Sequence, residues 1–107
     1  MSSEEDQLAV RDNTAKQRYE VQADGQVAVL EYQRKDGRIL LTHTEVPPAL
    51  EGRGIAGKLA RNALEAARAD GVEVVPLCTY VAAYIRRHQE YLTLVAEPFR
   101  DELRTGR

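Results

Sequence analysis

The sequence has a single cysteine, Cys78, and no long run of apolar residues. One cysteine cannot form a disulfide within the chain, which fits a reducing cytoplasm. No apolar run approaches the length of a membrane span and the N-terminus lacks a secretory pattern, so we expect no membrane association. The formal net charge of −2 gives no basic excess, so nucleic acid is not an expected partner.

What is present indicates one ordered domain. The chain has 107 residues, of which 43% are hydrophobic and 30% charged, enough for one modest core. Residues 1–15 are expected to form an extended or disordered N-terminal tail, whose first seven residues are polar and acidic. Residues 16–107 are expected to form a single domain.

The first half of the domain predicts a three-stranded antiparallel meander. Three alternating segments, RYEVQA, QVAVLEYQR and RILLTHTEV, are separated by Asp24-Gly25 and Asp36-Gly37, which are strong hairpin signals. Strict alternation in the third strand places His43 on the face of Leu41 and Glu45. Pro47-Pro48 then ends this strand.

The second half predicts a helix, a strand and a second helix. Apolar residues recur at helical spacing over 55–69, Asp70-Gly71 stops that helix, and VEVV forms a short buried strand. A second helix is predicted over 79–88, with Thr79 as its N-cap. TLVA predicts a last short strand, and residues 97–104 a final polar helix. The expected fold class is therefore α+β.

The stretch LEGRGIAGKLA, residues 50–60, places three glycines where the longest helix begins. One interpretation is a flexible loop before a helix with a poor first turn. The other is an anion site, because a helix N-terminus offers free N–H groups and glycines let a phosphate approach them. The spacing matches neither the Walker A loop nor the dinucleotide fingerprint.

Three motifs, HTEVP, GRGIAGKL and PLCTYVAAYIRRHQEY, occur in this order between His43 and Tyr91. Together they resemble the small N-acetyltransferases of the GNAT superfamily that carry a cysteine after their last core strand. The resemblance implies a minimal GNAT-like fold with acetyl-coenzyme A as cosubstrate, an amine acceptor and no metal. Glu51 departs from the family pattern, which usually has a basic or amide residue there. The backbone amides implied to grip the coenzyme's pyrophosphate are those of Arg53, Gly54, Ile55, Ala56, Gly57 and Lys58.

The resemblance also implies three catalytic candidates. Cys78, otherwise interpretable as a small buried hydrophobe, becomes a thiol beside the acetyl-CoA cleft at a helix start. Tyr84 becomes the acid that protonates the departing coenzyme A thiolate. His43, which as a lone strand histidine is more often a structural residue than a catalyst, becomes a candidate base for the acceptor amine. Tyr80 and Tyr91 are interpreted as packing residues, and His88 as a structural C-cap or a ligand contact.

The expected reaction is acetyl transfer from acetyl-CoA to an amine: a protein lysine, an N-terminus or a small amine. Transfer proceeds either directly or through an acetyl-cysteine at Cys78. The alternative is a non-catalytic module that binds coenzyme A or acyl-CoA, or that mediates protein contacts.

Overall fold

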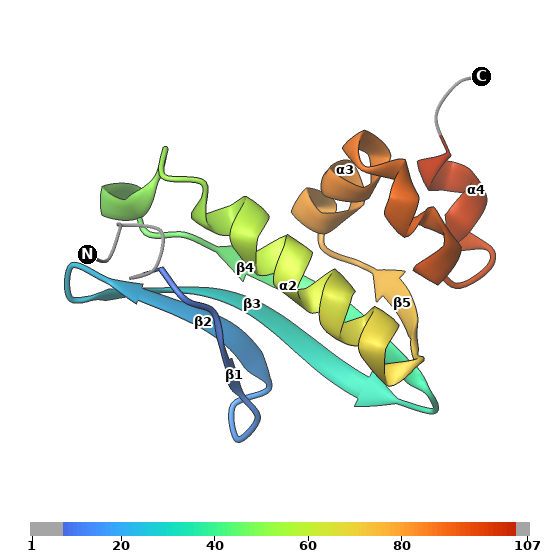
Figure 1. The fold of residues 1–107 in the computed structure, drawn as a ribbon, viewed down its shortest axis with the longest axis horizontal. Helices are drawn as coiled ribbons and strands as arrows, with labels where there is room; N and C mark the ends of the chain where they lie inside the picture. Colours follow the sequence, from blue (N-terminus) through green and yellow to red (C-terminus); the bar gives the residue numbers. More distant parts are fainter. Residues whose placement is uncertain (1–7, 105–107) are drawn as a thin grey trace.

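Five strands form one mixed sheet in the order β1-β2-β3-β4-β5 in the computed structural model, which describes residues 8–104 (Figure 1). Pairing is antiparallel from β1 to β4, and β5 is parallel to β4. The α+β class and the meander predicted from the sequence are therefore confirmed. The elements are β1 (Arg11–Asn13), β2 (Arg18–Ala23), β3 (Gln26–Lys35), β4 (Arg38–Glu45), η1 (Pro48–Leu50), α2 (Ile55–Asp70), β5 (Glu73–Pro76), α3 (Thr79–Arg87), η2 (Gln89–Leu94) and α4 (Phe99–Leu103).

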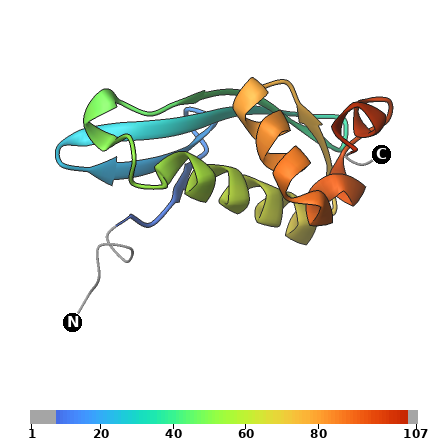
Figure 2. The same cartoon turned by 90° about the horizontal axis from the view of Figure 1, so that it is seen from above.

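The two longest helices, α2 and α3, lie on the same side of the sheet, here called the helix face (Figure 2). The apolar stripe of α2 is fully buried there against the sheet. Tyr19, Val21 and Leu30 from β2 and β3 belong to this core, as do residues of β4, β5 and α3. Val29 and Val75 are also buried but do not belong to the core cluster, because their side chains lie on the opposite side of the sheet, here called the open face.

Both predicted hairpin turns are present. Asp24 and Gly25 have φ values of 53° and 76°, and Asp36 and Gly37 have 54° and 76°. Two successive positive φ angles match the right-handed twist of paired strands, which is why Asp-Gly favours such turns. The first hairpin brings Asp24 within reach of the glycine-rich loop, as described below.

The end of the chain differs from the prediction for TLVA. Thr93 and Leu94 belong to η2, and only Val95 touches the sheet, through one parallel bridge to Val74. The backbone N–H of Ala96 donates to the carbonyl of Val74 at 2.9 Å. The strand prediction was wrong because the β-branched and apolar residues of TLVA, which favour a strand, here supply only one buried bridge, that of Val95. The final helix is shorter than predicted, Phe99–Leu103.

Part of the predicted N-terminal tail lies in the described structure. β1 pairs with β2, and Leu8 is only 5% exposed within the core. The first seven residues, predicted to be disordered, lie outside the described range. The boundary at residue 16 stays a prediction, with the described residues before it in contact with the domain.

A β-bulge in β4 corrects the predicted faces of that strand. Glu31 pairs with His43 but Tyr32 pairs with Leu41, so Thr42 is an extra residue. An extra residue inverts the alternation beyond it. Thr44 therefore pairs with the buried Leu30 on the helix face, whereas His43 and Glu45 turn to the open face.

Candidate functional site

The glycine-rich loop approaches α2 through two left-handed residues. Gly52 and Gly54 have φ values of 83° and 74°, a region that side chains with a Cβ rarely adopt. Leu50, fully buried in η1, anchors the loop just before them. The conformation of the backbone therefore requires glycine at these two positions, whether or not a ligand binds there.

The first turn of α2 is open to an anion. Gly54 is its N-cap, and within residues 8–104 no side chain caps the helix and no acidic residue lies in its first turn. The first N–H groups of a helix carry partial positive charge and need an acceptor from outside the helix. Such a terminus, set against a glycine loop, is suited to a phosphate.

Arg53 is held by the neighbouring hairpin. Its Nη1 donates to Asp24 Oδ2 at 2.7 Å, and its side chain is mostly buried. This ion pair ties the loop to the β2–β3 turn. The Arg53 side chain therefore positions the loop. The part of Arg53 that the family resemblance implies would contact a ligand is its backbone N–H.

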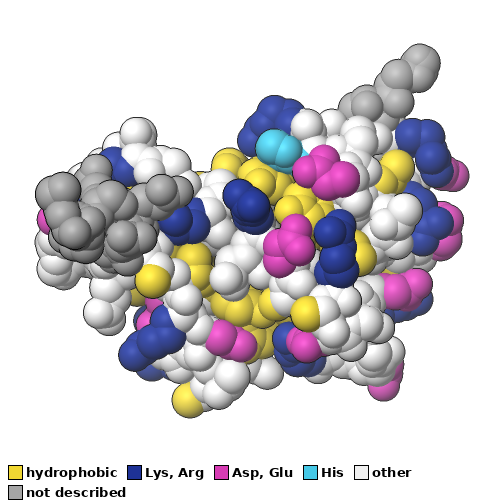
Figure 3. All heavy atoms as spheres, viewed as in Figure 1, with side chains coloured by type: hydrophobic (Ala, Val, Ile, Leu, Met, Phe, Trp, Pro, Cys, Tyr) yellow, Lys and Arg dark blue, Asp and Glu magenta, His cyan; other side chains and the backbone are white. Residues whose placement is uncertain are grey.

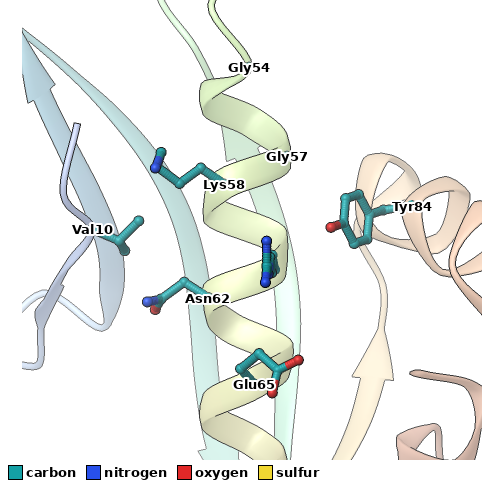
Figure 4. Close-up of a pocket in the computed structure, with 8 residues that line it drawn as sticks. Val10, Gly54, Gly57, Lys58, Asn62, Glu65 and Tyr84 are labelled. Atoms are coloured by element: carbon teal, nitrogen blue, oxygen red, sulfur yellow. The ribbon is translucent and has the colours of Figure 1, made fainter. Parts of the chain in front are cut away.

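Two grooves flank the start of α2. The first, here called the loop groove, has a volume of about 280 Å³ and runs between the loop, Val46 and Tyr80. The second, the helix groove, is about 520 Å³ and lies along the polar side of α2 (Figure 4). In that view Lys58 and Asn62 point toward Val10, and Tyr84 faces α2 from α3. Of the six predicted cofactor-binding residues, Gly54, Ile55, Ala56 and Gly57 line the loop groove, and Lys58 lines the helix groove together with Gly54 and Gly57.

The sheet forks where β4 and β5 stop pairing with each other. β4 pairs with β5 only as far as Leu41 with Pro76, and β4 then continues to Glu45 without this partner. The N–H of Cys78 donates to the carbonyl of Leu41 at 2.8 Å, which is the last link before the strands part. Cys78, rather than the predicted Thr79, is the N-cap of α3, and its thiol makes no capping bond.

The structure brings Cys78 together with Thr44 and not with His43. Cys78 is 7% exposed, and its Sγ lies 3.2 Å from Thr44 Oγ1. His43 lies on the open face, with its side chain 56% exposed and its Nε2 3.3 Å from Glu45 Oε1. An acceptor could therefore meet His43 only from the side of the sheet opposite α2 and α3.

The aromatic residues of α3 divide between the two grooves. Tyr80 lines the loop groove, while Tyr84 lines the helix groove and stacks on His88 with ring centres 4.2 Å apart. Burial raises the pKa of Tyr84 from the ordinary value of 10.0, so its hydroxyl is a weaker acid than that of an exposed tyrosine. Tyr91 is a packing residue, as predicted, and donates to Glu65 Oε2 at 2.7 Å. Arg86 and Arg87 are exposed.

The sequence did not predict the roles of two residues, Thr44 and Tyr80. Placing His43 on the face of Leu41 left Thr44 on the opposite face, and no sequence signal marks the bulge that turns Thr44 inward. Tyr80 was interpreted as packing, although its spacing of four from Tyr84 put both rings on one side of α3.

In residues 8–104, three features would indicate another kind of site: a metal-binding cluster, a membrane-spanning helix or a surface patch of one charge. No group of histidine, cysteine and carboxylate side chains there could hold a metal ion. No helix in that range is long and apolar enough to cross a bilayer. Basic and acidic side chains are interspersed over the side shown in Figure 3, and neither charge forms a large patch there.

Comparisons with known proteins agree with this geometry. Residues 18–94 match the family model described as GCN5-related N-acetyl-transferase. Protein NATD1 of chicken and of mouse is 40% identical over 62 residues, which cover 57% of this chain and 56% of each relative. The match thus spans little more than half of these relatives' length.

A solved structure shares the fold. The NMR solution structure of a GCN5-like protein from Staphylococcus aureus superposes with a TM-score of 0.67 at 20% identity. The superposition covers 84% of this chain and 89% of that one. With most of its length, including the loop, α2, β5 and α3, inside the matched family model, the chain belongs to the GCN5-related N-acetyltransferase family.

Proposed function

We propose that the protein is an N-acetyltransferase that moves an acetyl group from acetyl-CoA to an amine. The observation that carries the proposal is the loop groove, where the glycine loop and the uncapped start of α2 face Val46 and Tyr80. Family membership supports acetyl-CoA as the ligand of this groove. The acceptor would be a protein lysine, an N-terminus or a small amine.

The backbone amides from Arg53 to Lys58 would hold the pyrophosphate of acetyl-CoA. Open N–H groups and the helix dipole supply the attraction, and the Lys58 ammonium adds a positive charge beside them. Glu51 is exposed at the rim of the loop groove. Its carboxylate would weaken this attraction, because it brings a negative charge near the phosphates.

The acceptor amine must lose a proton before it attacks the thioester carbonyl. A C–N bond then forms, the C–S bond breaks, and the coenzyme A thiolate takes a proton from Tyr84 or Cys78. Backbone N–H groups at the fork of β4 and β5 would stabilise the charge that develops on the carbonyl oxygen. The Tyr84 hydroxyl is protonated at neutral pH and so has a proton to give, while the burial that raises its pKa makes it a weaker acid than an exposed tyrosine.

His43 is the proposed base, acting directly or through water on an acceptor that arrives at the open face. Its partner Glu45 would hold the imidazole in place. Cys78 has a second proposed role as nucleophile, taking the acetyl group as a thioester before the amine receives it. Direct transfer needs no intermediate and is the preferred route.

The alternative function is a module that binds coenzyme A or acyl-CoA without catalysis, or that mediates protein contacts. It is favoured by the open face, over which neither α2 nor α3 packs (Figure 2). An acceptor site there would have to be shallow. The two functions differ in whether an amine triggers release of coenzyme A.

Titration calorimetry with acetyl-CoA tests the binding step. Lys58→Glu should weaken binding by about tenfold or more, since it reverses a charge beside the phosphates. Lys35→Glu makes the same change of charge at the β3–β4 hairpin, and this variant should bind acetyl-CoA as tightly as the wild type. Absence of acetyl-CoA binding by the wild-type protein would refute both the enzyme and the coenzyme-binding alternative.

Release of coenzyme A in the presence of amines, compared with acetyl-CoA alone, tests catalysis. An acceptor-dependent release that falls in Cys78→Ala supports the enzyme with a role for Cys78. Binding without such release supports the non-catalytic module. Full activity of Cys78→Ala would reduce this cysteine to packing.

A further inference from the structure

A hydroxyl and a thiol meet across the fork of the sheet. Thr44 Oγ1, from the end of β4 that extends past β5, lies 3.2 Å from Cys78 Sγ at the start of α3. Thr44 is half-buried, and Cys78 is 7% exposed. Within residues 8–104 this is the one side-chain hydrogen bond that the thiol makes.

The β-bulge creates this contact. Without Thr42 as an extra residue, Thr44 would lie on the open face and could not reach α3. The hydroxyl of Thr42 donates to the carbonyl of Glu31 at 3.2 Å, which gives that strand carbonyl a partner at the irregular position. The strand thus departs from regular pairing at the point that turns Thr44 toward the cysteine.

The pair lies beside the loop groove. Val46, two residues beyond Thr44, and Tyr80, two residues beyond Cys78, both line that groove. The backbone on either side of the contact therefore leads directly into the cavity where the glycine loop is found.

We propose that Thr44 is the positioning residue for Cys78, holding its sulfur in the fork between β4 and β5, two residues from Tyr80 of the loop groove. A thiol can donate to the hydroxyl or accept from it, whereas a thiolate can only accept, and a threonine hydroxyl serves both forms. The bond therefore persists when the sulfur loses its proton and becomes nucleophilic. What the thiol then does in acetyl transfer rests on the proposed function; the positioning itself does not.

Alkylation of the native protein by iodoacetamide tests the assignment without any coenzyme. Cys78 is the only cysteine, so intact mass reports its modification alone. Thr44→Val keeps the shape of the side chain and removes the hydroxyl, and Thr44→Ser keeps the hydroxyl and removes the methyl group. Thr93→Val, at an exposed threonine of η2, is the matched control.

Thr44→Val should be alkylated about three- to tenfold more slowly than the wild type, because the thiolate loses a donor. Thr44→Ser and Thr93→Val should be alkylated at close to the wild-type rate. A rate for Thr44→Val at or above that of the wild type would overturn the proposal, as would a Thr44→Ser variant as slow as Thr44→Val.

If Thr44→Val fails to fold, Thr44→Ala takes its place, since alanine and serine also differ by the hydroxyl alone. The readout is independent of acetyl-CoA binding. A protein that binds no acetyl-CoA but shows hydroxyl-dependent alkylation would refute the proposed function and leave the positioning role intact.

Discussion

Gly57 is the one glycine of the loop region that the backbone does not require. Gly52 and Gly54 have positive φ, whereas Gly57 lies inside α2 with helical geometry. A Cβ added there would lie 3.6 Å from Tyr80 Oη and 3.8 Å from Tyr84 Cε2, which is ordinary contact. Nothing in the fold therefore excludes alanine, and the bare backbone at this position faces both grooves.

Gly57→Ala should stabilise the protein and weaken its ligand binding. Alanine within a helix is favoured over glycine by about 0.5–1 kcal/mol. The added methyl group would occupy the grooves and should weaken acetyl-CoA binding about tenfold, as a crowded contact costs roughly 1–3 kcal/mol. Thermal unfolding and calorimetry on the same samples measure the two effects.

Ala69→Gly is the matched control, because Ala69 is exposed on the same helix and lines neither groove. It should lower stability and leave binding unchanged. Tighter or equal binding in Gly57→Ala would show that the glycine serves no ligand.

At the scale of elements, β1 is a three-residue edge strand whose side chains complete a polar cluster on β2. Glu20 is 3% exposed and accepts hydrogen bonds from Arg18 Nε at 2.6 Å and from Arg11 and Asn13 at 3.0 Å. The bond from Arg18, with those from Asn13 and Arg11, lowers the pKa of Glu20 to about 2 against the opposing effect of burial. A buried carboxylate with three donors is thereby kept ionised.

Glu20→Gln should lower the free energy of unfolding by about 2 kcal/mol at pH 7, since bonds to a charged group are lost. A lowered folded-state pKa stabilises the protein above the ordinary value of 4.5, and this stabilisation disappears as the pH falls toward 2. Denaturant unfolding across this range should show a steeper loss in the wild type than in Glu20→Gln. Glu102→Gln, an exposed position on α4, should follow the wild type. Parallel pH profiles for wild type and Glu20→Gln would contradict the assigned role of Glu20.

At the scale of the whole molecule, the core lies on the helix face of the sheet, while Glu20 and its partners lie on the open face. The segment before residue 16 contributes to both. On the helix face, Leu8 enters the core and Asp12 accepts a hydrogen bond from Tyr32 at 2.7 Å, while on the open face Arg11 and Asn13 donate to Glu20. The domain predicted from residue 16 onward would lose all of these contacts.

A chain shortened to residues 16–107 should be less stable than the full chain by at least about 2 kcal/mol, the burial of one leucine alone being worth roughly this much. A chain beginning at Leu8 isolates the part due to residues 8–15. Chemical denaturation of the three chains measures the difference. Equal stability of the shortest and the full chain would place the domain boundary at residue 16 after all.

The sequence by itself determined the local features of this protein. Asp-Gly pairs fixed the two hairpins, because few residues tolerate successive positive φ angles. Helical spacing of apolar residues located α2, and the glycine loop before it located the grooves to within a few residues. The order of these motifs was enough to identify the family.

The tertiary structure alone decided which side chains meet. One extra residue in β4 reversed its faces, which brought Thr44 to Cys78 and sent His43 and Glu45 to the open face. Backbone pairing with β2 made β1 part of the sheet, and its Arg11 and Asn13 side chains donate to Glu20, although residues before 16 were predicted to form a tail. Register and burial arise from contacts between segments far apart in the chain, so a pattern within one segment does not contain them.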